Sequence, residues 1–230
     1  MPIGEINSAT LHHAILQHLV DYGCAPSRLA LAERFGVDAE VVAGALHALQ
    51  DMHGVVLHPH VPEVWIAHPF STAPTPFTVR HDARLWWGNC AWCSLGVAAL
   101  IGGNEVTIQT TLGAEGRPVT IHVDSGRVRE ELWVHFPIPM THAWDNVVYT
   151  CSTMLVFDSE SAIDGWCARH AIPRGDAQPI QRAYDFAGVW YGRHLDPDWK
   201  KWTTDEARRM FARFGFAGPV WALPESEQRF

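Results

Sequence analysis

Residues 86–96 constrain the fold of this chain more than any other segment, because they place two cysteines three positions apart at the start of an apolar run. The run continues through Ile101, and its residues suit a helix. Residues i and i+3 lie on one face of a helix, so the sulfurs of Cys90 and Cys93 can point toward one spot. A thiolate near a helix N-terminus is stabilised by the free N–H groups and the helix dipole. The segment therefore predicts a reactive thiol site, with two small buried apolar side chains as the alternative.

The composition indicates a globular protein and limits its partners. The chain has 230 residues, of which 47% are hydrophobic and 18% charged, enough for one large or two small domains. A formal net charge of −8 argues against a nucleic-acid surface. Five cysteines do not resemble a secreted disulfide framework, and the sequence has neither a signal-peptide pattern nor an apolar run of membrane-spanning length. We therefore expect a cytoplasmic protein with reduced thiols that binds neither nucleic acid nor a membrane.

Residues 1–76 carry the pattern of a winged-helix-like module followed by a linker. Apolar residues at helical spacing predict three helices, with caps at Asn7 or Ser8, Ser27 and Asp38 and ends at Gly23, Gly36 and Gly54. Two short apolar runs, 55–57 and 64–67, then predict a hairpin. The third helix contains acidic residues and no Lys or Arg, so we interpret the module as a structural or interaction domain that does not bind DNA. Prolines within 71–76 predict a linker.

Residues 77–230 are predicted to form a second domain that mixes strands and helices. Alternating apolar residues in 106–112 and 119–123 predict an antiparallel hairpin, and 132–136 predicts a third strand. Residues 150–157 form a β-prone run that contains Cys151. Helices are expected from about 159 to 170, from about 179 to 194, and over 207–214 behind a capping box at residues 203–206. The predicted class is α+β, with a small antiparallel sheet and flanking helices.

The cysteines allow several kinds of chemistry. Strands near the Cys90 helix can bring Cys151 close to it, and two or three converging thiolates favour Hg(II), Cu(I), Cd(II) and Zn(II) over hard cations. A zinc ribbon needs a second paired motif, which the sequence lacks, whereas three thiolates with one histidine can hold zinc. A dithiol redox centre also fits the C-x-x-C spacing, but the expected βαβ context is not evident.

Longer stretches make the sequence resemble the organomercurial (alkylmercury) lyases over nearly its whole length. The resemblance covers the N-terminal module, the Cys90 helix and the segment 143–154 around Cys151. It also covers Trp-Cys-Ala-Arg-His at 166–170 and His-Leu-Asp-Pro-Asp-Trp at 194–199. The resemblance implies an enzyme that cleaves carbon–mercury bonds by protonolysis and releases a hydrocarbon and Hg(II).

The same resemblance implies roles for three cysteines. In this family two thiolates and one carboxylate carry the reaction, and Cys90 and Cys151 match the two thiolates. The carboxylate is an Asp three residues after the first cysteine, where this chain has Cys93. Cys93 is then either the proton donor or a third ligand to the metal. No built-in cofactor is implied, because mercury arrives with a small organomercurial substrate and low-molecular-weight thiols would carry Hg(II) away.

Two other interpretations of the same residues remain open. A chain with three thiolates can be a soft-metal (copper or mercury) binding or sensing protein, or a thiol-dependent enzyme with a metal-free substrate. Asp145 is the best substitute for the missing carboxylate, although a turn or cap role suits it better. The other side chains considered are interpreted as packing or loop residues, with one tryptophan allowed to line a substrate pocket: Cys24, Cys167, His58, His60, Trp86, Trp87 and Trp92.

Overall fold

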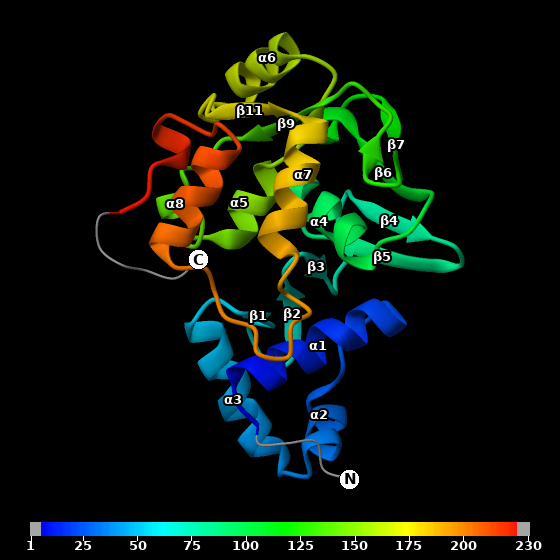
Figure 1. Ribbon diagram of the computed structural model, residues 1–230, viewed down its shortest axis with the longest axis vertical. Coiled ribbons are helices and arrows are strands. Elements are labelled where there is room, and N and C mark those ends of the chain that lie inside the picture. The colour runs from blue at the N-terminus through cyan, green and yellow to red at the C-terminus, as the bar shows by residue number, and fades with distance from the viewer. Residues whose placement is uncertain (1–5, 225–230) are drawn as a thin grey trace.

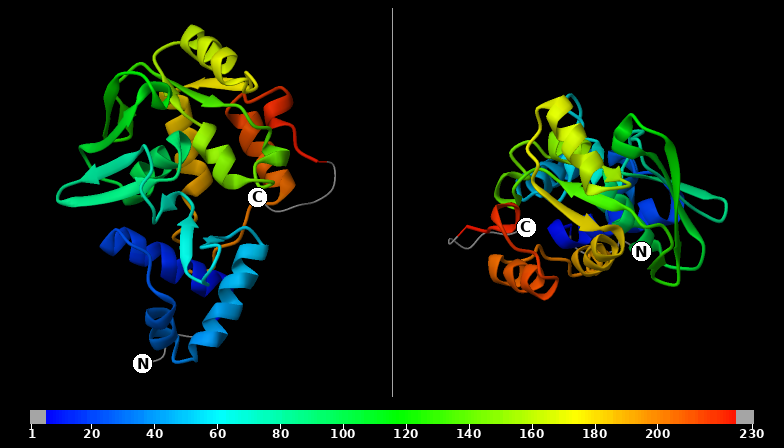
Figure 2. Two further views of the ribbon diagram at one scale, coloured as in Figure 1. Left: turned by 180° about the vertical axis from the view of Figure 1, so that it is seen from behind. Right: turned by 90° about the horizontal axis from the view of Figure 1, so that it is seen from above.

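The computed structural model describes residues 6–224, which form eight α-helices and two antiparallel sheets. Helices α1 to α3 lie at one end of the long axis and α6 lies at the other, in both the front and rear views (Figures 1 and 2). The fold is α+β, as the sequence predicts. No helix within the described residues is long and apolar enough to cross a membrane.

The three N-terminal helices lie where the sequence predicts, although α3 ends at Asp51, before the predicted stop at Gly54, and the side chain of its predicted cap Asp38 makes no hydrogen bond to the helix. Their bounds are α1 Ser8–Tyr22, α2 Arg28–Phe35 and α3 Ala39–Asp51. The Asn7 side chain accepts hydrogen bonds at the start of α1, and the Ser27 side chain does so for α2. Gly23 and Gly36 follow these helices in left-handed conformation, which glycine adopts without steric cost. The helices and the hairpin are thus confirmed, whereas their winged-helix arrangement stays a prediction.

The larger sheet contains eight strands in the order β1-β2-β3-β5-β4-β6-β7-β8. The strands are β1 Val56–Leu57, β2 Val64–Ala67, β3 Phe70–Ser71, β4 Thr78–His81, β5 Arg84–Gly88, β6 Val106–Thr111, β7 Pro118–Asp124 and β8 Arg127–Val128. The predicted β6–β7 hairpin is present, with Ile108 opposite Ile121. Strand β3 pairs with both β2 and β5, so the sheet continues past residues 71–76. The division into domains 1–76 and 77–230 stays a prediction.

The smaller sheet has the order β10-β9-β11 and holds the third predicted strand apart from the β6–β7 hairpin. Its strands are β9 Trp133–Phe136, β10 Val156–Phe157 and β11 Asp176–Pro179. The remaining helices are α4 Ala91–Ile101, α5 Val147–Thr153, α6 Glu160–His170, α7 Ile180–Tyr191 and α8 Thr204–Arg213. Three short 3-10 helices, Leu112–Ala114, Met140–His142 and Pro219–Trp221, complete the described elements.

One predicted element is wrong, because Cys151 lies on a helix and not on a strand. Helix α5 spans Val147–Thr153, and only Val156–Phe157 of the predicted β-run is extended. The Asn146 side chain accepts a hydrogen bond from the Tyr149 backbone N–H and so caps the helix. This cap starts a helical turn in a β-prone segment, and tertiary packing completes it.

Helices α4 and α7 pack closely at the centre of the molecule (Figure 1). A Cβ atom at Gly96 would lie 2.3 Å from the Tyr191 ring, so the two helices need glycine at this position. Around this contact the Trp92 ring stacks on Phe186 at a centroid distance of 4.9 Å. The close packing fixes the first turn of α4, which carries the thiols, against the C-terminal end of α7.

Candidate active site: a cluster of three thiols

Cys90 is the N-cap residue of α4, as the sequence predicts. Its Sγ accepts a hydrogen bond from the Cys93 backbone N–H at 3.2 Å, in the position that a serine oxygen usually occupies. Cys93 lies in the first turn, and both side chains are fully buried. The two sulfurs therefore sit at the positive end of the helix dipole, where negative charge on sulfur is stabilised.

Cys151 reaches these sulfurs because the end of α5 is tied to the start of α4. The Ala91 N–H donates to the Met154 carbonyl at 3.0 Å, and the Cys90 thiol contacts the Met154 thioether at 3.8 Å. The sulfurs of Cys151 and Cys93 lie within 4.8 Å of each other, and both Cys90 and Cys93 raise the pKa of Cys151. We call Cys90, Cys93 and Cys151 the thiol cluster; the structure brings all three predicted site residues together.

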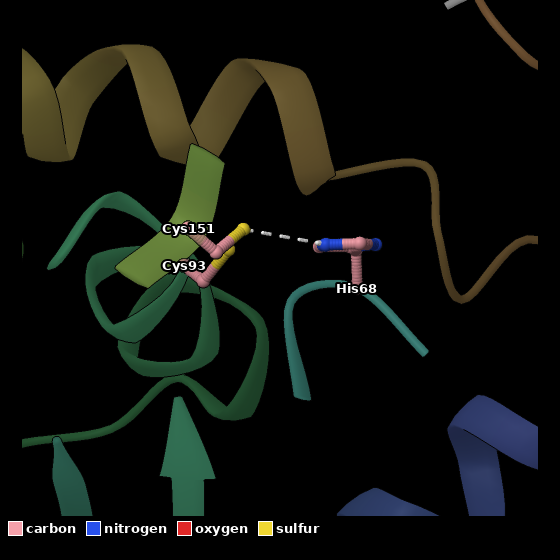
Figure 3. A group of neighbouring side chains, drawn as sticks. All are labelled: His68, Cys93 and Cys151. Carbon is pink, nitrogen blue, oxygen red and sulfur yellow. Dashed lines mark hydrogen bonds between the residues drawn. The ribbon is translucent and has the colours of Figure 1, made fainter. Parts of the chain in front are cut away.

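His68 borders the thiol cluster on the side of the connection between β2 and β3. Its Nε2 lies 3.7 Å from Cys151 Sγ (Figure 3). The ligand atoms of His68, Cys93 and Cys151 all lie within 4.8 Å of one another. The Asn89 side-chain amide donates to the same Nε2 at 3.1 Å, so this nitrogen acts as an acceptor. Burial lowers the pKa of His68, an effect that Cys93 only partly offsets, so the imidazole is neutral near pH 7.

The three thiols differ in acidity. Burial is the main cause that raises the pKa of Cys90 well above its ordinary value, and hydrogen bonds to the other two thiols are the main cause for Cys151. Burial also acts to raise the pKa of Cys93, but hydrogen bonds from Cys151 and Cys90 outweigh it and hold that pKa well below the ordinary value. The Tyr191 hydroxyl, 3.4 Å from Cys93 Sγ, adds to the lowering. The directions of these shifts make Cys93 the most acidic of the three thiols.

A partly open cavity of about 70 Å³ adjoins the thiol cluster. Its wall is mostly aromatic and apolar, with a few histidines and one lysine, and includes Trp92, Trp144, Tyr191, His194 and Lys201. Trp144 stacks on His53 at 4.5 Å, and the Lys201 ammonium lies 4.9 Å from the Trp144 ring centroid. Burial lowers the pKa of Lys201 to about 7, and burial also lowers the pKa of His194 to about 3. Near pH 7, His194 is therefore neutral and Lys201 is about half protonated.

The other residues considered from sequence lie outside the thiol cluster. Cys24 is exposed, and Asp145 is an exposed turn residue that accepts from His142 Nδ1 at 2.7 Å. Cys167 is buried and contacts His135 Nε2 at 3.6 Å. His58 and His60 lie in the β1–β2 connection, and the buried Trp86 indole donates to the Leu19 carbonyl. Among the three tryptophans singled out, Trp92 is the one that lines the cavity.

Sequence reasoning misses three residues that face the thiol cluster or its cavity. Tyr191 has a detectable signal, because it lies seven residues after Tyr184 on one face of a predicted helix and ends that helix. His68 and Lys201 have no such signal, since each reaches the site from a segment without regular structure. Their placement depends on chain folding over long sequence distances.

Comparisons with known proteins identify the fold and the family of the chain. The family model for alkylmercury lyase (MerB) matches residues 70–192, more than half of the chain. A crystal structure described as the mercury-bound form of MerB2 superposes with a TM-score of 0.65 at 18% sequence identity, over 82% of this chain and 91% of that chain. No curated protein matches. At that identity the superposition shows the shared fold, and the family match shows the relationship: this chain belongs to the alkylmercury lyase family.

Proposed function

We propose that this protein is an organomercurial lyase that cleaves carbon–mercury bonds by thiolate-assisted protonolysis. The observation that carries the proposal is the convergence of Cys90, Cys93 and Cys151 on one mostly apolar cavity. Mercury binds thiolates more strongly than any other protein ligand, and an apolar wall accepts the organic group. The substrate is then a small organomercurial cation, R–Hg⁺.

One thiolate and two thiols have the composition that the reaction needs. The Cys93 thiolate first binds the mercury of R–Hg⁺, which neutralises both charges. A neighbouring thiol then gives its proton to the carbon, so that the S–H and Hg–C bonds break while C–H and S–Hg bonds form. The electron pair of the Hg–C bond becomes the C–H bond, and no oxidant or reductant is required. The products are R–H and Hg(II) bound by two thiolates.

We assign Cys151 as the thiol that donates its proton to the carbon, and Cys90 as a further sulfur ligand of the product Hg(II). The neighbouring thiols raise the pKa of Cys151, so it keeps its proton at neutral pH, and it lines the cavity into which that proton is delivered. The family resemblance gives the first attack to Cys90, whereas the lowered pKa of Cys93 supports Cys93 as the first thiolate. Cys90 then binds the product Hg(II) until low-molecular-weight thiols remove it.

The size of the cavity favours small organic groups. A buried apolar cavity of about 150 Å³ accommodates benzene, and the cavity here is about half that volume, at about 70 Å³. Methyl and ethyl groups fit such a space without movement of the wall. We therefore propose short-chain alkylmercury as the preferred substrate, and expect phenylmercury to require displacement of Trp144.

Soft-metal binding is the second candidate function, and the identity of residue 93 favours it. The family carries a carboxylate at that position, which moves the proton and binds mercury weakly. A third thiolate binds Hg(II) or Cu(I) strongly and slows release of the metal. A protein with this site could therefore hold a metal ion without turning over.

A single-turnover assay separates the two functions. Reduced, metal-free protein is mixed with methylmercury and an excess of a small thiol, and both methane and free Hg(II) are followed. A lyase releases one methane per active site and then releases Hg(II). Mercury bound tightly with an intact carbon–mercury bond would reject the lyase and establish the binding protein. The Cys24→Ser variant is the matched control, because Cys24 is exposed and outside the thiol cluster.

A further inference from the structure

We propose that His68, Cys93 and Cys151 form a binding site for a divalent metal ion of borderline softness, Zn(II) in particular, with His68 as a protein ligand. This site goes beyond carbon–mercury cleavage, because neither an organomercurial nor turnover is needed to fill it. It stands on the placement of one imidazole nitrogen and two sulfurs.

The spacing of the donor atoms fits a tetrahedral ion. Zn–S and Zn–N bonds of about 2.3 and 2.0–2.1 Å place a sulfur and a nitrogen about 3.6 Å apart on the edge of a tetrahedron. His68 Nε2 and Cys151 Sγ lie 3.7 Å apart. The third donor, Cys93 Sγ, lies within 4.8 Å of both, so contraction by about 1 Å or less completes the set.

The three donors come from three separate segments, which face one another across a small gap (Figure 3). His68 lies between β2 and β3, Cys93 is in the first turn of α4, and Cys151 is on α5. A bound ion would therefore link the β2–β3 connection to the α4–α5 contact. Such a cross-link between distant segments stabilises the folded chain by mass action.

The imidazole presents the nitrogen that a metal requires. Nε2 accepts from the Asn89 amide at 3.1 Å, so it carries the lone pair, and the proton is on Nδ1. The amide orientation that gives this tautomer follows from the hydrogen-bond network. His68 also keeps partial exposure and lines the cavity, which gives an ion a route from solvent. A metal at this nitrogen replaces the Asn89 hydrogen bond, and it displaces the proton of the Cys151 thiol as that sulfur becomes a ligand.

The donor set selects the class of metal. One imidazole with two thiolates suits Zn(II), Cd(II) and the spectroscopic substitute Co(II), and it does not suit Mg(II) or Ca(II). Three protein ligands leave the fourth position of a tetrahedron open, as in sites where water or substrate binds zinc. Cys90 stays outside this group, since its Sγ accepts the Cys93 N–H and contacts Met154. Because the ion uses Cys93 and Cys151, zinc is expected to compete with organomercurials.

Co(II) binding to the full-length, reduced protein tests the site. Wild-type protein should give the visible bands of tetrahedral Co(II) with thiolate-to-metal charge transfer, at one ion per chain, and Zn(II) should displace them. The His68→Ala variant should lose affinity by roughly 10–100-fold, the range found when even an outer-shell partner is removed. The His60→Ala variant is the matched control, because His60 is an exposed histidine of the β1–β2 connection and should bind as wild type does.

Two further measurements keep the test decisive. Added imidazole should restore Co(II) binding to His68→Ala, which a merely misfolded variant would not allow. The Cys167→Ser variant should keep Co(II) affinity close to wild type, because Cys167 is a buried cysteine beside a histidine but outside the thiol cluster. The site is wrong if wild-type protein binds neither Co(II) nor Zn(II), or if His68→Ala binds them unchanged. Methylmercury cleavage by the metal-free protein is measured separately, so loss of this site with intact turnover would reject the metal site and leave the lyase standing.

Discussion

Two cysteine–histidine contacts within residues 6–224 have nearly equal lengths, but they differ in what surrounds them. Cys151 Sγ lies 3.7 Å from His68 Nε2, and Cys167 Sγ lies 3.6 Å from His135 Nε2. The two imidazoles differ in which ring nitrogen carries the proton. His135 Nε2 donates to the Arg174 carbonyl at 2.8 Å and so has no lone pair for the neighbouring sulfur or a metal. His68 Nε2 acts as an acceptor and keeps its lone pair.

A tryptophan packs edge-on against each imidazole, which extends the parallel. Trp144 lies 5.2 Å from His68 at an interplanar angle of 76°, and Trp166 lies 5.8 Å from His135 at 78°. Trp166 is buried with 6% exposure in the core, whereas Trp144 is half-buried and lines the cavity. Trp144 can therefore move toward solvent, whereas Trp166 is held in place by the packing around it.

The comparison shows that a cysteine–histidine contact gains chemical meaning from what else converges on it. Cys151 meets two more thiols and a cavity, while the Cys167 thiol donates to the Pro173 carbonyl at 3.7 Å and burial raises its pKa. We expect the Cys167–His135 pair to stabilise the fold and the Cys151–His68 pair to act on ligands. Substitutions in matched positions separate these roles.

The largest expected effect comes from replacing Cys151 with serine, and the matched replacement of Cys167 is its comparison. Cys151→Ser removes the proposed proton donor and a mercury ligand, so methylmercury turnover should fall by roughly 10²–10⁴-fold, the usual contribution of a general acid. Cys167→Ser should keep turnover near wild type and lose about 1 kcal/mol of stability. Single-turnover release of methane and urea denaturation measure the two quantities. Equal losses of turnover in both variants would contradict the comparison.

Replacement of Cys93 has the next largest expected effect. Cys93→Ser removes the resting thiolate, and we expect turnover to fall by roughly 10–100-fold while mercury binding to Cys90 and Cys151 persists. Cys93→Asp restores the carboxylate of the family and should keep turnover but release Hg(II) faster, since oxygen binds this soft metal weakly. Stopped-flow transfer of Hg(II) to a small thiol measures the release. Unchanged turnover in Cys93→Ser would remove residue 93 from the mechanism.

Truncation of the two tryptophans is expected to alter substrate preference in one case and stability in the other. Trp144→Ala enlarges the cavity and should raise kcat/KM for phenylmercury about tenfold relative to methylmercury, the discrimination that a change of cavity volume commonly gives. Trp166→Ala should destabilise the protein by about 3–5 kcal/mol, the usual cost of truncating a buried tryptophan. The folded fraction of Trp166→Ala should keep the wild-type ratio of kcat/KM for phenylmercury to kcat/KM for methylmercury. A constant ratio in Trp144→Ala would show that Trp144 does not limit substrate size.

Much of this fold can be predicted from local sequence. Caps at Asn7, Ser27 and Thr203 mark helices whose starts the structure confirms, because a cap depends on residues within one turn. The alternation in 106–112 and 119–123 likewise gives the β6–β7 pairing. The β4–β5 hairpin is missed although its strands pair locally, since its residues lack a strong alternating pattern. Strand β11 is missed because it also lacks that pattern and pairs with the distant strand β9.

The candidate site is only partly predictable for the same reason. Cys90 and Cys93 share one helical turn, so their proximity follows from spacing alone. The arrival of Cys151 depends on the hydrogen bond between Ala91 and Met154, which joins segments more than sixty residues apart. The protonation pattern depends on the three-dimensional contacts of all three sulfurs. No local pattern encodes the approach of His68, because it precedes β3 in a short turn.

The smallest effect that we expect concerns the pH profile and sharpens the role of the Cys93 thiolate. The Tyr191 hydroxyl lies 3.4 Å from Cys93 Sγ and helps to lower the pKa of that thiol. Removal of this hydroxyl in Tyr191→Phe should raise the pKa of Cys93. Because the thiolate is the active form, kcat/KM rises as pH rises through that pKa, so the acidic limb of the profile should move to higher pH. The maximal rate at high pH should change by less than about threefold, since the ring itself remains.

Tyr184→Phe is the matched control, because Tyr184 lies on the same helix and does not line the cavity. An acidic limb at the wild-type position in Tyr191→Phe would mean that the hydrogen bonds among the thiols alone set the acidity of Cys93. An acidic limb shifted to higher pH with an unchanged plateau would instead show that the Tyr191 hydroxyl helps to lower the pKa of Cys93. Cys167, beside His135, lacks such a neighbour within residues 6–224, and burial raises its pKa.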